Sequence, residues 1–237
     1  ARHSWAILAL LVRFIREYWP QTRIVFRGDS HFSKPRLLAW CDRNQVDYIV
    51  GMARNQRLEA LAAPAMDKVR TYYEAHGHKL ASTFRFRYKA RSWHKPRWVV
   101  ARLEYGPQGP NPRFVISSRY DDGFKLYYEQ YCARGDMENR IKDQQLDLFA
   151  GRTSSTHWWT NQWRLILSGF AYTLFERLRV HLKNTPFERM SAGTLRLKLI
   201  KVGAVIIRNT RRIRVLMSDS YPHKNDLSAL VQRLVPQ

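Results

Sequence analysis

"RIVFRGDSHFSKPRLLAWCDRNQVDYIVGM", residues 23–52, is the stretch of sequence that decides the fold. Strand-forming residues open it ("TRIVF", from residue 22) and close it ("DYIVGM", residues 47–52). Between them, Ser33 is a candidate helix cap, and Pro35 lies in the first turn of a helix expected over residues 33–45. A crossover helix connects parallel strands, whereas antiparallel strands need only a short turn. The stretch therefore predicts a parallel strand–helix–strand unit, which is typical of α/β folds.

The rest of the chain first continues this α/β pattern and then departs from it. Helices are expected on either side of the unit, over residues 3–19 and 55–69. Alternating or β-branched runs at residues 82–90, 97–105 and 113–118 are separated by Gly and Pro, and they indicate antiparallel strands. The expected later elements are helical structure from about residue 125, long helices at roughly 156–184 and 191–201, a strand hairpin at 204–217 and a short helix at 224–235.

The composition predicts a folded protein with a polyanionic partner. A chain of 237 residues, of which 45% are hydrophobic, can bury a sizeable core. Its 41 Lys and Arg residues outnumber 19 Asp and Glu residues, which gives a formal net charge of +22. Such an excess of positive charge indicates nucleic acid as the partner. Aromatic residues make up 13% of the chain and could also stack on bases, although most of them should lie in the core.

The sequence argues against a membrane protein and against a disulfide-rich secreted one. The apolar runs at residues 5–12 and 163–180 are too short or too highly charged to cross a bilayer, so we expect no membrane contact. The two cysteines, Cys41 and Cys132, lie far apart and show no metal-ligand spacing. A reducing, cytosolic compartment therefore fits the chain best.

Two short stretches carry candidate chemistry. Asp29 follows the first strand in a Gly-Asp-Ser setting, where it could be either a turn residue or a metal ligand. In "YCARGDMENRIKDQQ", residues 131–145, helical spacing puts Arg134, Glu138 and Lys142 within about 60° of Tyr131 on one face. This face could be a solvated one with ordinary ion pairs, or it could place a metal-binding carboxylate beside side chains that bind phosphate.

Together, "RGDSHF" and "YCARGDMENRIK" resemble the DDE transposases of bacterial insertion sequences (group 1 DDE domain), specifically the branch with a Tyr-x2-Arg-x3-Glu-x6-Lys signature. The resemblance implies an α/β fold of the ribonuclease-H-like type with a β-rich insertion and a helical C-terminal region. Four segments are expected: a partial core at 1–80, the insertion at 81–120, core helices carrying the catalytic Glu at 121–185, and a helical and hairpin region at 186–237.

The resemblance also implies the site and its partners. Asp29 and Glu138 would be catalytic carboxylates that bind Mg²⁺, for which Mn²⁺ can substitute, and Tyr131 and Arg134 would contact DNA. The signature's Lys falls on Gln145, so Lys142, one turn earlier, would take its place. The implied substrate is double-stranded DNA, both transposon ends and target, bound by a homodimer in the bacterial cytoplasm and associated with the nucleoid.

Further candidates for DNA contact lie outside the signature. Trp93 and Trp98 could stack on an unpaired base, as an insertion-domain Trp does in some related transposases, or they could pack in the core. The three Trp residues of "HWWTNQWR", residues 157–164, are expected in the core. The basic stretches at residues 85–97 and 208–214 are candidates for contact with DNA phosphates.

One departure from the family pattern limits the functional prediction. Residues 1–28 contain no Asp, so the first of the three carboxylates that the resemblance implies is absent. We therefore expect this chain to be the C-terminal part of a transposase and inactive by itself. Two alternatives remain, a nucleic-acid-binding protein without catalysis and a metal-dependent nuclease of the same fold. Joining of a pre-cut DNA end to target DNA would separate them, because only a transposase joins strands.

Overall fold

The strand–helix–strand stretch forms the parallel unit that its sequence predicts. In the computed structural model, which describes residues 3–234, β1 (Val25–Gly28) pairs in parallel with β2 (Asp47–Met52). The connecting helix is α2 (Pro35–Arg43), and its N1 position is the proline. The chain divides into two compact parts, residues 1–135 and 136–237, which we call the N-terminal and C-terminal units. The strand–helix–strand motif lies in the N-terminal unit.

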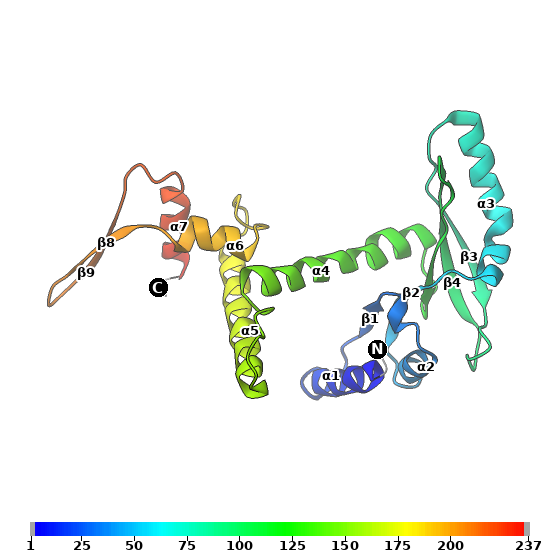
Figure 1. Cartoon of the computed structure of the whole chain (residues 1–237), viewed down its shortest axis with the longest axis horizontal. Coiled ribbons are helices and arrows are strands. Elements are labelled where there is room, and N and C mark those ends of the chain that lie inside the picture. Colours follow the sequence, from blue (N-terminus) through cyan, green and yellow to red (C-terminus); the bar gives the residue numbers. More distant parts are fainter. Residues whose placement is uncertain (1–2, 235–237) are drawn as a thin grey trace. The chain divides into compact units, whose positions relative to one another are not determined.

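The expected antiparallel strands extend the same sheet. β3 (Ser82–Tyr88), β4 (Arg97–Leu103) and β7 (Arg113–Ser117) pair antiparallel, and β7 joins them to β2. The five strands have the order β1-β2-β7-β4-β3, so β1 lies at one edge of a mixed sheet (Figure 1). The short strands β5 (Tyr105–Gly106) and β6 (Gly109–Pro110) form a separate small ribbon. The prediction of an α/β fold is confirmed.

Helices cover both faces of this sheet, because its central strands bury alternate residues on opposite sides. One face packs against α1 (Ser4–Tyr18), α2 and α3 (Gln56–His76). The sheet residues on that face include Tyr48, Val50, Val99, Ala101, Phe114 and Ile116. On the other face, Ile49, Val100 and Val115 pack against Leu126 and Tyr127. The N-terminal unit is therefore a three-layer arrangement.

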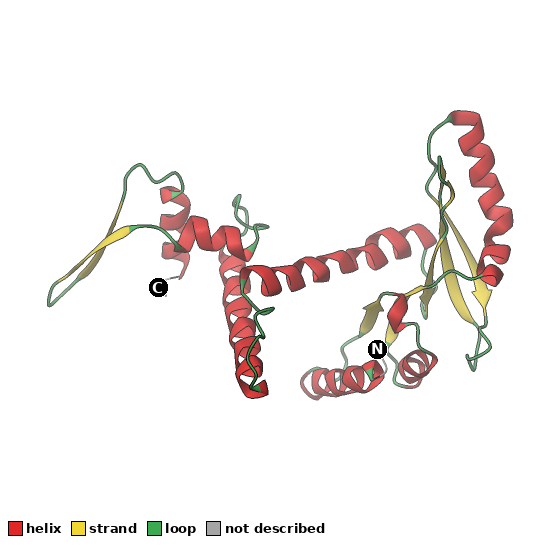
Figure 2. Cartoon of the chain, viewed as in Figure 1, coloured by secondary structure: helices red, strands yellow, loops and turns green. Residues whose placement is uncertain are grey.

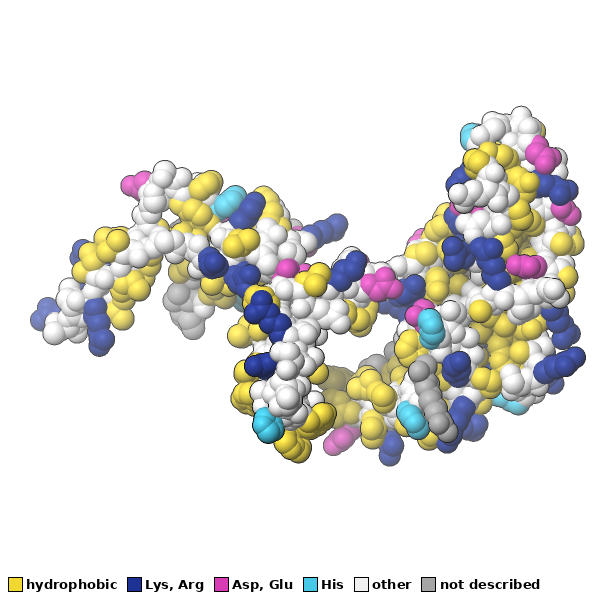
Figure 3. All heavy atoms as spheres, in the orientation of Figure 1, with side chains coloured by type: hydrophobic (Ala, Val, Ile, Leu, Met, Phe, Trp, Pro, Cys, Tyr) yellow, Lys and Arg dark blue, Asp and Glu magenta, His cyan; other side chains and the backbone are white. Residues whose placement is uncertain are grey.

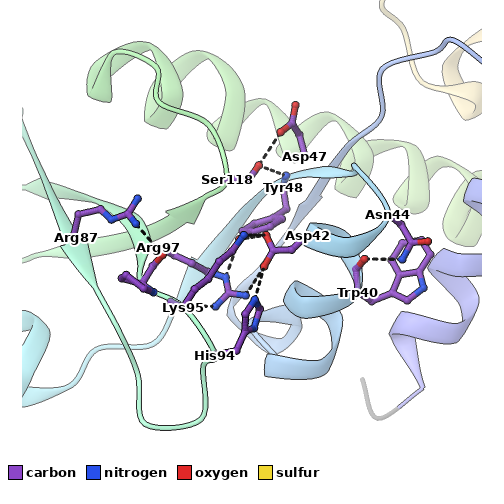
Figure 4. Close-up of polar contacts among 11 residues, drawn as sticks. Trp40, Asp42, Asn44, Asp47, Tyr48, Arg87, His94, Lys95, Arg97 and Ser118 are labelled. Carbon is purple, nitrogen blue, oxygen red and sulfur yellow. Dashed lines mark hydrogen bonds and ion pairs between the residues drawn. The ribbon is translucent and has the colours of Figure 1, made fainter.

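A buried ion pair fastens α2 to the sheet (Figure 4). Arg97 on β4 is 3% exposed and donates to Asp42 of α2 at 2.6 Å and to the hydroxyl of Tyr48 on β2 at 2.8 Å. Lys95 and His94, from the loop before β4, lie 3.1 and 3.6 Å from the same carboxylate. The network thus holds α2, β2, β4 and this loop together.

Residues 125–147 are helical throughout, but their pitch is not uniform. η2 (Lys125–Tyr131) is a π-helix, η3 (Cys132–Arg134) is a 3₁₀ turn, α4 (Gly135–Lys142) is an α-helix, and η4 (Asp143–Asp147) is again a π-helix. The constant 100° per residue assumed from the sequence is therefore wrong here, because π and 3₁₀ turns advance by different angles. The common face of Tyr131, Arg134, Glu138 and Lys142 stays a prediction.

The C-terminal unit is built around α5 (Trp158–His181), α6 (Ala192–Leu195), its continuation η5 (Arg196–Ile200), and α7 (Lys224–Leu234) (Figures 1 and 2). Their small core consists of Leu182, Phe187, Leu195, Leu199 and Leu230. The expected hairpin is formed by β8 (Ala204–Arg208) and β9 (Ile213–Met217). Val235, the last residue of the expected final helix, lies outside the described residues.

The tryptophans of α5 do not lie where the sequence suggested. Trp158, Trp159 and Trp163 are 62%, 77% and 58% exposed, so the expectation that they pack in the core is wrong. Helical spacing of aromatic residues is compatible with burial but does not supply the layer that would cover them. None of the helices that the structure describes is long and apolar enough to cross a membrane.

Candidate active site

Asp29 lies directly after β1, in a turn that its own side chain stabilises. It occupies the cap position of the short 3₁₀ helix η1 (Ser30–Phe32), and its Oδ1 accepts the backbone N–H of His31 at 2.9 Å. The His31 imidazole is itself exposed, with Nδ1 3.4 Å from Oδ1. The turn therefore uses one carboxylate oxygen of Asp29, and the role of Asp29 as a metal ligand stays a prediction. The other oxygen, Oδ2, meets no donor in the part of the chain that the structure describes.

Tyr131 lies beside this turn because of a glycine on the neighbouring strand. Gly51 of β2 has no side chain, and a Cβ placed there would lie 2.5 Å from the Tyr131 hydroxyl, 3.0 Å from the Ser30 nitrogen and 3.3 Å from the Asp29 carbonyl carbon. The hydroxyl and the backbone after Asp29 thus converge on one point of the sheet. The structure brings together two candidate residues that the sequence separates widely.

Contacts along η2 hold Tyr131 in this position. Arg27 of β1 donates to the backbone carbonyl of Gln130 at 2.9 Å. The centres of the Tyr131 and Tyr127 rings lie 5.6 Å apart. Burial raises the pKa of the Tyr127 phenol above its ordinary value, so this ring stays uncharged at neutral pH. The Arg134 guanidinium lies 5.4 Å from the centre of the Tyr131 ring. Arg134 therefore lies beside Tyr131.

The remaining signature residues lie in the C-terminal unit. Glu138 and Lys142 are exposed on α4, one turn apart. Lys142 also lines a hollow of about 780 Å³ that Arg140, Asp143 and Arg179 border. Arg179 is only 6% exposed and pairs there with Asp143, which gives that hollow a structural ion pair. The convergence of Glu138 with Asp29 stays a prediction.

The two candidate tryptophans differ in their surroundings. Trp93 is 4% exposed and packs edge-on against Tyr88 with Arg97 over its ring, so it is a core residue and cannot stack on a base. Trp98 is half-buried at the surface of β4, with its ring centre 4.8 Å from that of Tyr120. Of the two alternatives that the sequence left open, the structure supports core packing for Trp93 and a surface position for Trp98.

Arginines surround Trp98 and make its surroundings positive. Arg87 lies 4.9 Å from the Trp98 ring centre, and Arg85 lies 3.7 Å from that of Tyr120. We call Arg85, Arg87, Trp98 and Tyr120 the Trp98 cluster. Cations beside exposed aromatic rings can hold a phosphate and a base at the same time.

The donor set around Asp29 suits a hard divalent cation only in part. One free carboxylate oxygen at a strand end is the kind of ligand that Mg²⁺ accepts, together with waters and substrate phosphate. A single carboxylate is not enough, however, and the described residues contain no group of three or more His, Cys, Asp or Glu placed to hold one ion. Asp29 alone therefore does not make a metal site, and an ion shared with Glu138 stays a prediction.

Sequence reasoning missed three residues that shape this site: Gly51, Tyr120 and Gln130. Gly51 did carry a signal, since a glycine inside a strand often marks the close approach of another group. Gln130 acts through its backbone carbonyl, to which any residue type could contribute. Tyr120 is near Trp98 only because β7 lies beside β4 in the sheet. Neither of these two could be found from local patterns.

The chain matches a known family along its whole length. Residues 1–237 match the sequence model of the family described as transposase DDE domain, group 1. No curated protein matches the chain. The family match spans both units and so includes all the candidate residues above.

Proposed function

Because this chain belongs to the transposase family described as DDE domain group 1, we propose that its site cleaves transposon ends and joins them to target DNA with the help of two divalent ions. DNA is the substrate that the family implies. The observation that carries the proposal is that the Tyr131 hydroxyl and the Asp29 backbone meet at Gly51, next to the end of β1, while the Arg134 guanidinium lies over the Tyr131 ring. Such a grouping places an acidic ligand beside phosphate-binding side chains in a protein whose net charge is +22.

Asp29 and Glu138 are the residues that would hold divalent ions. When bound, such ions activate a water or a 3′-hydroxyl and stabilise the leaving oxygen of a phosphodiester. Asp29 is suited to this role because the Oδ1–His31 hydrogen bond fixes its carboxylate and leaves Oδ2 for a ligand. Asp29 follows β1, and Glu138 lies on α4, just beyond the boundary between the two units.

The basic and aromatic side chains would bind and orient the DNA. Arg134 can pair with a phosphate near Asp29, and the Tyr131 hydroxyl can donate a hydrogen bond to it. Lys142 would add a third phosphate contact from α4. Trp98, with Arg85 and Arg87, would hold an unpaired base and its phosphate away from the reacting bond. Together these contacts would orient the strand for in-line attack.

A third carboxylate is needed to complete the set of ligands. The family resemblance puts it on a strand beside β1, and β1 is the edge strand of the sheet, with only β2 beside it among the described residues. Residues 1–28 supply no Asp for that position. We propose that this ligand must be added for full activity, that the ribonuclease-H-like arrangement is complete only with it, and that the chain as given binds DNA without joining strands.

A strand-joining assay tests this function. The assay mixes the chain with a labelled pre-cut DNA end and a supercoiled target in Mg²⁺ or Mn²⁺, and compares it with a version extended by an upstream strand that carries the missing Asp. We expect DNA binding by both proteins and joining only by the extended one. Glu138→Gln in the extended protein should abolish joining and spare binding.

The other functions predict different results in the same assay. A nuclease of this fold would nick the target and join nothing, even in the extended form. A nucleic-acid-binding remnant would bind and do neither. Joining by the 237-residue chain alone would show that a third ligand exists among residues whose only assigned role is in the fold.

A further inference from the structure

The hairpin β8–β9 is an exposed two-stranded ribbon without a covering layer. All five residues of each strand are exposed. The strands contact each other extensively, and no other helix or strand of the described residues packs against them to a comparable degree. Figure 2 shows the ribbon extending from the helices of the C-terminal unit. An isolated two-stranded hairpin is marginally stable in water, so a ribbon of this kind is expected to bind a partner.

The end of the ribbon is strongly basic. Arg208, Arg211, Arg212 and Arg214 lie within seven consecutive residues and are all exposed. No Asp or Glu occurs between Glu188 and Asp219. In Figure 3 the dark blue side chains gather at the end of the hairpin, and yellow hydrophobic side chains cover its strands. The end of the ribbon therefore suits a negatively charged partner.

The strand register distributes the positive charge over both faces of the ribbon. Arg208 pairs with Ile213, and Ile207 pairs with Arg214. Because consecutive pairs point to opposite faces, each face has one arginine and one isoleucine next to the turn. The turn itself is held by Asn209, whose Oδ1 accepts the N–H groups of Arg211 and Arg212 at 3.1 and 2.7 Å. The arginines are thus presented by a preformed turn.

We propose that β8–β9 is an arm that enters a groove of duplex DNA, with arginines on both faces contacting the phosphates of the two groove walls. The major groove is about 12 Å wide and accepts a two-stranded ribbon. Apolar side chains such as Ile213 can contact thymine methyl groups there. The inference rests on the proposed function only in taking DNA as the substrate.

A second copy of the chain is a poorer occupant than DNA. A second copy, whose whole chain carries a formal net charge of +22, would present the same basic ribbon to an end that has four arginines and no acid. Pairing between two such hairpins would bring like charges together, which is unfavourable. Duplex DNA instead offers a phosphate about every 1.7 Å along its axis. Charge complementarity therefore favours DNA.

The test compares two variants that lose the same charge. The arm variant combines Arg208→Ala, Arg211→Ala, Arg212→Ala and Arg214→Ala, and the control combines Arg43→Ala, Lys68→Ala, Lys183→Ala and Lys224→Ala, all at exposed positions. Duplex DNA is titrated at several salt concentrations. We expect the slope of log K against log salt to fall in magnitude by about 3.6 in the arm variant, since each of the four lost phosphate contacts removes about 0.9, and by less than about 1 in the control. Equal slopes for the two variants would overturn the proposal.

A second measurement locates the arm on DNA. Thr210→Cys, made in a Cys132→Ser background, is labelled with an iron chelate that cuts nearby DNA, and Cys41 does not interfere because it is fully buried. We expect cuts whose strand offset identifies the major groove. If the labelled protein binds DNA but does not cut it, the proposal that β8–β9 enters a DNA groove is wrong. If the wild-type protein does not bind DNA at all, the proposed function is wrong instead.

The alternative occupant gives its own result. Ile206 and Val215 form a cross-strand pair on one face of the ribbon. If the ribbon contacts a second copy, replacing both by Thr should convert a dimer to a monomer in sedimentation without DNA, and that outcome would contradict the DNA arm. If the ribbon binds DNA, sedimentation of the free protein should not change.

Discussion

At the scale of single residues, the absence of one side chain positions the candidate site. Gly51 is surrounded on β2 by large β-branched and apolar residues that build the core, yet only hydrogen fits there. The space that a Cβ would take is shared by the Tyr131 hydroxyl and the backbone that follows Asp29. Backbone cannot move aside as a flexible side chain can, so this position connects the sheet directly to the geometry of Asp29.

Gly51→Ala should lower the free energy of unfolding by about 1–3 kcal/mol, because the new methyl group forces Tyr131 and the Ser30 backbone to shift. Urea denaturation measures this change in the free energy of unfolding. Gly135→Ala is the matched control, since a Cβ there meets nothing within 4 Å and the residue is helical, so we expect a stabilisation of up to about 1 kcal/mol. In a Tyr131→Phe background, Gly51→Ala should lower the free energy of unfolding by less than it does in the wild type. If the two substitutions instead lower it additively, the Tyr131 hydroxyl is not what the new methyl group meets.

Cys41 should make folding weaker at alkaline pH. Burial raises the pKa of this thiol from 9.0 to about 12. In the unfolded chain it ionises at its ordinary pKa, so its contribution to stability is fully present below pH 9 and is lost as the pH rises toward 12. Urea unfolding at intervals between pH 8 and 11 should show this loss, and a Cys41→Ala variant should show a smaller one. Burial also raises the pKa of Tyr48, so some pH dependence should remain.

At the scale of elements, the Arg97–Asp42 pair decides how α2 and the sheet fit together. The Arg97 and Asp42 side chains are 2% and 9% exposed, so removing the cation leaves a poorly solvated carboxylate. Arg97→Met should therefore cost about 3–5 kcal/mol of unfolding free energy, and Asp42→Leu in the same protein should recover part of it. Thermal or urea unfolding measures both. Arg91→Met, at an exposed position, should change stability by less than about 0.5 kcal/mol.

Local sequence patterns predicted most helices and strands, because these elements depend on residue types that lie close together in the sequence. Pro35 opens α2, and the runs at 82–88 and 97–103 form strands, as their residue types favour. Two features could not be predicted in this way. The packing of Leu126 and Tyr127 from η2 on the sheet is one, and the Trp98 cluster, which follows from the strand order, is the other. Both depend on long-range contacts, which a single sequence does not reveal.

At the scale of the whole molecule, the signature residues are divided between the two units. Asp29, Tyr131 and Arg134 belong to the N-terminal unit, and Glu138 and Lys142 to the C-terminal unit. The sequence identified these residues by a family signature, whereas physical chemistry alone left the face of residues 131–142 open to a solvated interpretation.

We predict that Asp29 and Glu138 lie within about 10 Å of each other when metal is bound, because two ions about 3.5–4 Å apart and their ligands fit inside that span. Mn²⁺ binding measured by calorimetry, with DNA present, tests it. Asp29→Asn and Glu138→Gln should each weaken Mn²⁺ binding at least about tenfold, and the double variant should be no worse than either single one, since both act on one site. Glu129→Gln on η2 is the control and should leave Mn²⁺ binding unchanged. Additive losses in the double variant would mean two separate ions on two separate carboxylates, and the shared metal site would then be wrong even though the DNA-binding surface remained.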